Sequence, residues 1–294
     1  MRLRKRTLIA SCACIVALTP LVHAQTPPAD NTEQSQDTCA QTTYRGVAPK
    51  ISNPKTSKQI QILCSGFYSV GYFGPTKTPL WSAEHLTTAS VEAGSKFGRP
   101  DSNAFQPDTR IPEPNRSQLA DYKGSVKLGY DRGHMTPSED APTESMRVKT
   151  FLLSNIVPQA SVMNRGVWAG IEKQVREITK HVGDLYVVTG PAYIGSNFRW
   201  IGPDHVLVPS STWKAVYIPS LHASGVYVCS NNTQKPLCSI VSASQLTAAT
   251  GIDPFPSTEI AEKNNRLKLP QPIYHGDLEK TTSPSNAQQT APKN

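Results

Sequence analysis

The stretch NRGVWAGIEKQVREITKH at residues 164–181 decides the fold class of this chain of 294 residues. Its apolar residues follow one another at intervals of four, four and three, which places them on one face of an α-helix: Val167, Ile171, Val175 and Ile178. Gly183 stands where a C-terminal helix cap is expected. The stretch is therefore predicted to be one amphipathic helix whose apolar face packs on a core.

Short runs of β-branched and aromatic residues lie on both sides of this helix, and we expect them to be strands. They are residues 61–73 (strand, turn, strand), 151–157, 185–188, 206–208, 213–218, 225–229 and 236–241, with weaker extended candidates at 78–82 and 90–93. Residues 95–117 hold four prolines and are predicted to form a long irregular loop. Many strands around one strong helix predict an α+β fold, not a doubly wound one.

The two ends of the chain differ in composition from this middle part. Residues 1–24 combine four basic side chains with an apolar stretch and a small residue at the end, which is typical of a cleaved export signal. A membrane anchor fits less well because the apolar stretch is too short, and lipidation at Cys12 is an alternative. The predicted division is a signal peptide at 1–24, a flexible linker at 25–38, one folded domain at 39–275 and a disordered tail at 276–294.

Export would place the protein in the periplasm or outside the cell. The formal net charge is +8, and four of the positive charges belong to the predicted signal peptide. The remaining chain has a net charge of +4, which is too small to argue for a nucleic-acid partner by itself. No apolar run approaches the length of about 20 residues that a membrane-spanning helix needs.

Four cysteines lie outside the signal peptide, and an even number in an exported chain predicts two disulfides. Three pairings are open, and the shortest loops favour Cys39–Cys64 and Cys229–Cys238. A metal site is the weaker alternative, because the four cysteines form no C-x-x-C pair.

The chemistry of the chain concentrates between residues 129 and 176. Asp131-Arg132-Gly133-His134 joins an imidazole that can accept a proton near neutral pH to a guanidinium that can hold a phosphate. Glycine between them allows a sharp turn of the backbone. Taken alone, the tetrapeptide could equally be a surface turn with a solvated histidine.

A second polar group follows on the predicted helix. Asn164, Trp168, Glu172 and Arg176 are spaced by four and share one broad face. Oxygen ligands from asparagine and glutamate suit a hard cation such as Mg²⁺, which keeps several waters and needs few protein ligands. Glu172 and Arg176 could also form a plain ion pair one turn apart.

Together these residues resemble the DNA/RNA non-specific endonuclease family, the ββα-metal nucleases that include mitochondrial endonuclease G. The match consists of Asp131-Arg132-Gly133-His134, then Asn155, Pro158 and Gln159, then Asn164, Trp168, Glu172 and Arg176. A softer likeness extends over most of residues 65–260. The resemblance implies a central antiparallel β-sheet flanked by helices, with a ββα-metal motif at the active site.

The resemblance also implies an enzyme that uses Mg²⁺, with Mn²⁺ as the alternative, to cut DNA and RNA into products with 5′-phosphates. His134 would be the general base, Asn164 the one direct protein ligand of the metal, and Glu172 would hold the metal through water. DNA and RNA would be bound through the phosphate backbone, so sequence preference should be weak.

The remaining roles follow from the same resemblance. Arg132 and Arg176 would bind the scissile phosphate, and Asn155 and Gln159 would shape or support the substrate-binding part of the site. Asp131 would be an orienting group. Family members carry a further arginine in the loop before the motif; Arg99 is preferred here, with Arg110 as the alternative.

Two other functions are compatible with the sequence: a non-catalytic protein that binds nucleic acid or another polyanion, and a metal-dependent phosphodiesterase acting on another substrate. A homodimer and an inhibitor protein are both open as partners.

Overall fold

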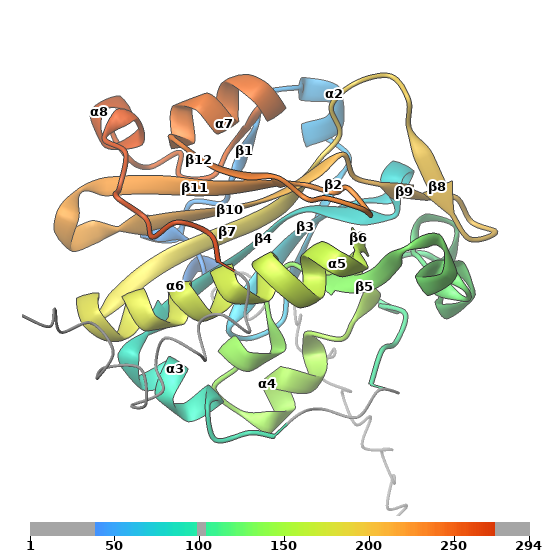
Figure 1. Ribbon diagram of the computed structural model, residues 1–294, viewed down its shortest axis with the longest axis horizontal. Helices are drawn as coiled ribbons and strands as arrows, with labels where there is room; N and C mark the ends of the chain where they lie inside the picture. The colour runs from blue at the N-terminus through green and yellow to red at the C-terminus, as the bar shows by residue number, and fades with distance from the viewer. Residues whose placement is uncertain (1–38, 99–103, 274–294) are drawn as a thin grey trace, which may run out of the picture. The chain divides into compact units, whose positions relative to one another are not determined.

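The computed structural model of the chain describes residues 39–98 and 104–273 (Figure 1). The predicted signal peptide, the linker and the predicted tail lie outside the described residues, and so does Arg99. Within the described part no helix is both long and apolar enough to cross a membrane.

A seven-stranded sheet forms the centre of the fold, and every neighbouring pair of its strands is antiparallel. From one edge to the other its strands are β12 (Cys238–Val241), β11 (Ala223–Ser230), β10 (Ser211–Ile218), β7 (Asp184–Ala192), β4 (Thr78–Thr87), β3 (Tyr68–Phe73) and β2 (Ile60–Cys64). The predicted α+β class with a central antiparallel sheet is confirmed.

Both faces of this sheet are covered, which explains why its central strands are apolar nearly throughout. In β10, Trp213, Ala215 and Tyr217 point to one face and pack with α7 (Ala243–Thr250). Val216 and Ile218 point to the other face and pack against the long helix. In Figure 1 the long helix lies below the sheet, and α7 and α8 (Ile260–Asn264) lie above it.

The predicted helix is present and begins three residues early. It consists of α5 (Ser161–Met163), the π-helical turn η8 (Asn164–Trp168) and α6 (Ala169–Val182). Gly166 breaks the helical backbone inside η8 with φ −110° and ψ −107°. At the other end Gly183 has φ +94°, and its N–H bonds to the carbonyl of Thr179, so it caps the helix as expected.

The helix buries more of its surface than the periodicity predicts. The apolar stripe joins a core with Leu86, Leu185 and Val216 of the sheet. Trp168, placed on the polar face by its spacing, is completely buried in the same core. Only part of that face therefore remains for chemistry.

Two local predictions were wrong, and a third strand is longer than predicted. Residues 90–93 belong to α3 (Thr88–Gly94), where the side chain of Thr87 caps the first turn. The run at 151–157 divides into a 3₁₀ turn, η7 (Leu153–Asn155), and a strand, β6 (Ile156–Ala160), which continues through Pro158. The run at 185–188 is a strand as predicted, and it continues past Gly190 and Pro191 as part of β7. Proline is tolerated in β6 because this strand pairs on one side only.

The short elements complete the described chain. They are α2 (Pro54–Ser57), α4 (Glu144–Lys149), the strand pairs β1 (Lys50–Ile51) with β13 (Ile252–Asp253) and β8 (Arg199–Ile201) with β9 (Val206–Val208), the strand β5 (Tyr130–His134), which pairs with β6, and the 3₁₀ turns η1 (Tyr44–Gly46), η2 (Gly74–Thr76), η3 (Glu113–Asn115), η4 (Leu119–Tyr122), η5 (Ser125–Leu128), η6 (Ser138–Asp140) and η9 (Pro219–Leu221). Disulfides join Cys39 to Cys64 and Cys229 to Cys238, the two pairs favoured by loop length.

Candidate active site

The Asp-Arg-Gly-His motif lies in strand β5, not in a turn. β5 pairs antiparallel with β6, with Arg132 opposite Pro158 and His134 opposite Ile156. Gly133 is required there for space: a Cβ at this position would lie 2.3 Å from the Cβ of Gln159. The sharp turn expected at this glycine is therefore replaced by a close approach between two strands.

Asn155 directly precedes β6 and Gln159 belongs to it, and neither has exposed surface. The Asn155 side chain accepts a hydrogen bond from the N–H of Thr136 (3.0 Å) and donates to the carbonyls of Thr136 (2.9 Å) and Thr150 (3.0 Å). The amide of Gln159 reaches Thr212 of β10 at 3.4 Å. Both residues are thus placed to support the site, and neither is placed to touch a substrate.

His134 ends β5, and its ring contacts two phenylalanine rings that also contact each other. Its centroid lies 4.8 Å from that of Phe151 and 5.4 Å from that of Phe105. Nε2 is buried and has no hydrogen-bond partner among the described residues. Burial, assisted by the positive charge of Arg132, lowers the pKa of His134 to about 4. The ring is therefore neutral at pH 7 and can accept a proton.

Asp131 joins β5 to the start of the helix. Its carboxylate accepts hydrogen bonds from Ser161 (2.9 Å), from the side-chain amide of Asn164 (3.1 Å) and from Arg165 (2.6 and 2.8 Å). Burial alone would raise the pKa of Asp131, but these hydrogen bonds outweigh it and lower the pKa. Asp131 is therefore an ionised acceptor at neutral pH, which fits the orienting role.

This contact fixes the orientation of the Asn164 amide. A carboxylate only accepts hydrogen bonds, so the nitrogen of Asn164 must face Asp131 and Oδ1 must face the other way. Oδ1 makes no hydrogen bond within the described residues. An amide oxygen held in this way is a suitable ligand for Mg²⁺ or Mn²⁺. No group of three or more His, Cys, Asp or Glu side chains offers a rival metal site in that part of the chain.

Glu172 lies two turns further along the helix and is partly buried. Burial raises the pKa of Glu172 to about 7, although the charges of Lys214 and Arg176 act in the opposite direction. No ion pair joins Glu172 to Arg176 within the described structure. Arg176 instead pairs with Asp140 (3.0 Å) and Glu139 (2.5 Å) of η6. The carboxylate of Glu172 is thus left for another cation.

Two charged side chains of the main sheet, Lys214 and Glu84, are buried near these residues. Lys214 of β10 is 1% exposed; its ammonium donates to Thr189 (2.7 Å) and lies 3.5 Å from the carbonyl of Met135. It also lies 5.7 Å from the ring centroid of Trp168. Glu84 of β4 is equally buried, and burial together with the charge of Asp140 raises its pKa well above the usual range. Lys214 therefore links the sheet to the residue that follows His134.

A groove of about 850 Å³ opens in front of the motif. Its lining includes Arg132 and Asn164 together with Phe105 and Lys123. The guanidinium of Arg132 stacks 4.1 Å above the Phe105 ring and has no acidic partner within the described residues. Arg132 therefore offers a positive charge without an acidic partner in this groove.

The two arginine candidates before the motif have different outcomes. Arg99 lies outside the described residues and stays a prediction. Arg110 is fully engaged: it forms a bidentate pair with Asp108 (2.6 and 2.9 Å) and donates to the carbonyl of Cys64 (2.6 Å). Arg110 thus ties its loop to β2 and is not free to bind a phosphate.

Several functional neighbours were absent from the predictions. Phe105 and Phe151 contact His134 from other parts of the chain, and Asp140 reaches Arg176 from η6. No local pattern marks such long-range contacts. Arg165 could have been found, because it directly follows Asn164 and its charge complements Asp131.

Comparison with known proteins gives one consistent result. Residues 48–260 match the profile of the DNA/RNA non-specific endonuclease family. The chain is 34% identical over 211 residues to Nuclease C1 of Cunninghamella echinulata var. echinulata, an alignment that covers 66% of this chain and 82% of that protein. It is 33% identical over 184 residues to human mitochondrial nuclease EXOG, covering 58% of this chain and 47% of that protein.

Two further matches agree. A nuclease of Syncephalastrum racemosum is 44% identical over 149 residues, covering 50% of this chain and 45% of the relative. The chain thus spans less than half the length of this relative and of human EXOG. Among solved structures, a chain from the EndoG/EndoGI complex superposes with a TM-score of 0.56 at 25% identity, covering 77% of this chain and 92% of that one.

Proposed function

The chain belongs to the DNA/RNA non-specific endonuclease family, and from this premise we propose that it is an exported, Mg²⁺-dependent endonuclease that cuts DNA and RNA into products with 5′-phosphates. One observation carries the proposal: Arg132 and His134 both lie against the ring of Phe105, which lines one groove with Asn164. A positive charge for a phosphate, a neutral base and an amide oxygen for a cation are thereby gathered at one place.

The proposed reaction is hydrolysis of the bond between phosphorus and the 3′ oxygen. The neutral imidazole of His134 takes a proton from the attacking water, whose oxygen forms a new bond to phosphorus. The 3′ oxygen leaves and takes up a proton, and the phosphate stays on the 5′ side of the next nucleotide. Arg132 holds the phosphate oxygens on which negative charge grows during the attack.

The residues present suit the proposed cofactor. Asn164 would hold Mg²⁺ directly, and Glu172 would hold it through water; Mn²⁺, which also accepts oxygen ligands, is the alternative. Bound Mg²⁺ would stabilise the negative charge on the phosphate and the leaving oxygen. Arg176 adds positive charge beside Glu172, although Asp140 and Glu139 compensate much of it.

Export and partners are part of the same proposal. Two disulfides support an oxidising compartment, which fits a cleaved signal peptide and a periplasmic or secreted protein. The solved relative is an EndoG chain in complex with EndoGI, in a study of EndoG inhibition. We propose that an inhibitor protein can act on this chain as well. A homodimer stays a prediction that light scattering can check.

A single experiment tests the proposal. Plasmid DNA and RNA are incubated with the purified protein in Mg²⁺, in Mn²⁺ and in EDTA, beside His134→Ala and a surface control, Lys58→Ala. We expect both polymers to be cut only with metal, His134→Ala to lose at least about 100-fold in rate, and the control to cut normally.

The other outcomes decide between the rival functions. Retardation of nucleic acid without cutting by the wild type would favour the polyanion binder. Hydrolysis restricted to nucleotides or lipid headgroups would favour another phosphodiesterase. Rapid cutting by a correctly folded His134→Ala would remove His134 from its role as the base.

A further inference from the structure

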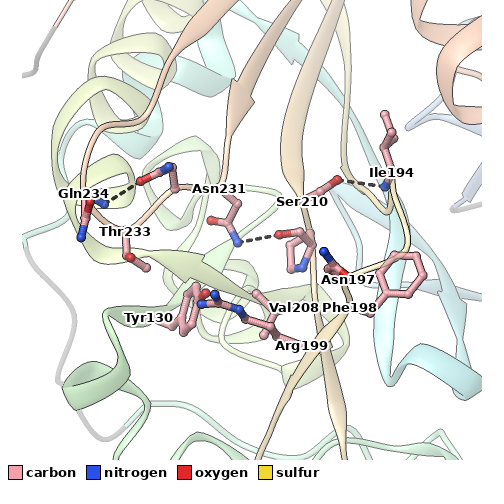
Figure 2. Close-up of a pocket in the computed structure, with 12 residues that line it drawn as sticks. Tyr130, Ile194, Asn197, Phe198, Arg199, Val208, Ser210, Asn231, Thr233 and Gln234 are labelled. Carbon is pink, nitrogen blue, oxygen red and sulfur yellow. Dashed lines mark hydrogen bonds between the residues drawn. The ribbon is translucent and has the colours of Figure 1, made fainter.

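A second pocket, of about 440 Å³, opens beside the first residue of β5. Tyr130 and Arg199 line it at one side, Asn197 and Phe198 at one end, and Thr233 and Gln234 at the other (Figure 2). Tyr130 lies two residues before Arg132 on the same strand. The pocket is therefore a neighbour of the proposed cleavage site, yet no step of the reaction uses it.

The charge of the pocket favours an anionic ligand. Its twelve lining residues include no aspartate and no glutamate. Arg199 is exposed and makes no ion pair or side-chain hydrogen bond within the described residues. A guanidinium without an acidic neighbour, at the edge of a concave surface, is well placed to bind a phosphate.

The neutral groups of the pocket suit a nucleobase. The side-chain amides of Asn197 and Gln234 form no hydrogen bonds within the described part of the chain, so each offers a donor and an acceptor. Such amides can pair with the edges of bases. The exposed ring of Phe198 adds flat apolar surface of the kind on which unpaired bases stack, whereas Tyr130 is buried in the wall of the pocket.

Asn231 fixes the pocket relative to the cleavage site. Its side chain accepts from the N–H of Ala160 (2.6 Å) and donates to the carbonyls of Pro158 (3.0 Å) and Pro209 (2.9 Å). Ala160 is opposite Tyr130 and Pro158 is opposite Arg132 in the strand pair. One wall of the pocket is thus bonded to β6, the strand that pairs with the motif strand β5.

The spacing agrees with a polymer that occupies both places. Two residues along a strand span about 7 Å. A nucleic-acid strand rises about 3.4 Å per nucleotide in a duplex and can extend further when single. Tyr130, which lines the pocket, therefore lies one or two nucleotide steps from Arg132 along β5.

We propose that this pocket is a subsite for an unpaired nucleotide that flanks the scissile phosphate, with its phosphate on Arg199 and its base against Phe198 and the amides of Asn197 and Gln234. The inference rests on the proposed nuclease function and extends it. Bases must be unstacked to enter a pocket, so the subsite favours single-stranded DNA and RNA. It also gives a base preference to an enzyme whose other contacts are with phosphates.

The first test measures binding without cleavage. In a His134→Ala background, the anisotropy of a labelled single-stranded 12-mer and of the same sequence as a duplex is titrated with Arg199→Ala. Arg266→Ala, which removes an exposed arginine outside the pocket, is the matched control. We expect Arg199→Ala to weaken single-strand binding about tenfold and duplex binding less than twofold, while the control changes neither by more than twofold.

The second test reads the base preference. Active wild-type protein, Asn197→Ala and Gln234→Ala cut a randomised single-stranded oligonucleotide pool, and the product ends are sequenced. We expect the wild type to show a base bias one or two positions from the cut, and each amide variant to flatten that bias.

The outcomes separate the subsite from the function. If the wild type cuts nucleic acid but the Arg199→Ala and amide variants match it in binding and bias, the subsite is overturned. Equal losses on single strands and duplexes would make Arg199 a general backbone contact and would also overturn it. A wild-type protein that neither binds nor cuts nucleic acid would instead refute the proposed function.

Discussion

At the scale of single residues, the site depends on how one amide is turned. Asp131 selects the rotamer of Asn164 that leaves Oδ1 available, because its carboxylate can only accept. Asp131→Asn offers both a donor and an acceptor, so the Asn164 amide can turn over. We expect the affinity for Mn²⁺ or Mg²⁺, measured by calorimetry, to fall about 10–100-fold.

The control for this prediction is Arg165→Met. It removes the other strong partner of Asp131 but keeps the carboxylate that orients Asn164. Its metal affinity should stay within a few-fold of the wild type. An Asp131→Asn variant that binds metal normally would show that Asn164 is oriented by something else.

His134 gives a second prediction at this scale, for stability against pH. Its pKa is about 4 in the folded protein, below the ordinary value of 6.5 that applies to the unfolded chain. As the pH falls from 6.5 to 4 the unfolded chain takes up a proton that the folded protein does not. This side chain's contribution is therefore complete above pH 6.5 and is lost as the pH falls to about 4.

The size of the effect can be measured directly. The shift corresponds to about 3 kcal/mol at most. Urea unfolding at pH 7 and pH 4.5 should show a larger loss of stability for the wild type than for His134→Gln, by about 2–3 kcal/mol. Equal losses in the two proteins would mean that the imidazole is not held neutral by its surroundings.

At the scale of elements, the strand pair β5–β6 depends on a missing side chain. Alanine at Gly133 would place its Cβ against Gln159, and Gln159 itself is fully buried. We expect Gly133→Ala to cost about 1–3 kcal/mol in urea unfolding and to reduce kcat, because β5 carries Arg132 and His134. Gly98→Ala, with no atom within 4 Å of the added Cβ, is the neutral control.

A compensating change makes this prediction sharper. Gly133→Ala combined with Gln159→Gly removes the contact from the other side and should recover part of the lost stability. If the double variant is less stable than the sum of its two parts, the clash is not the cause of the loss.

The same elements show what the sequence can and cannot reveal. The helix from Asn164 was predictable because its apolar periodicity lies within one short stretch of sequence. The family was predictable because the motif residues between Asp131 and Arg176 follow one another in a fixed order along the chain. Gly133 was wrongly predicted to form a turn, because glycine is required there by the close approach of Gln159 on the neighbouring strand. Residues 90–93 were wrongly predicted to be extended. They form part of α3, whose first turn is capped by the side chain of Thr87.

Contacts between residues that are distant in the sequence could not be predicted from local patterns. Nothing near Arg176 in the sequence indicates that η6 will supply Asp140, and nothing near Lys214 indicates that it will be buried under Met135. Both contacts join segments that lie far apart in the sequence.

At the scale of the whole described fold, the two disulfides lie at opposite edges of the main sheet. Cys64 belongs to β2, the last strand at one edge, and Cys238 belongs to β12 at the other. Edge strands are where a sheet frays and pairs with other chains. The cross-links therefore secure both edges, while the ββα motif packs over the middle of the sheet.

This arrangement predicts that the disulfides act on stability and not on chemistry. From the loop lengths, removal of Cys39–Cys64 by alanine substitution should cost about 3.5 kcal/mol, and removal of Cys229–Cys238 about 2.7 kcal/mol, in urea unfolding. Below its melting temperature each variant should keep the kcat of the wild type, because neither cross-link touches the groove.

If folding depends on both bonds, protein that is kept reduced should be inactive until oxidised, which would protect the nucleic acid of the producing cell. Full activity of the reduced protein would exclude such protection, and a fall in kcat in a fully folded variant would show that the sheet edges reach the active site.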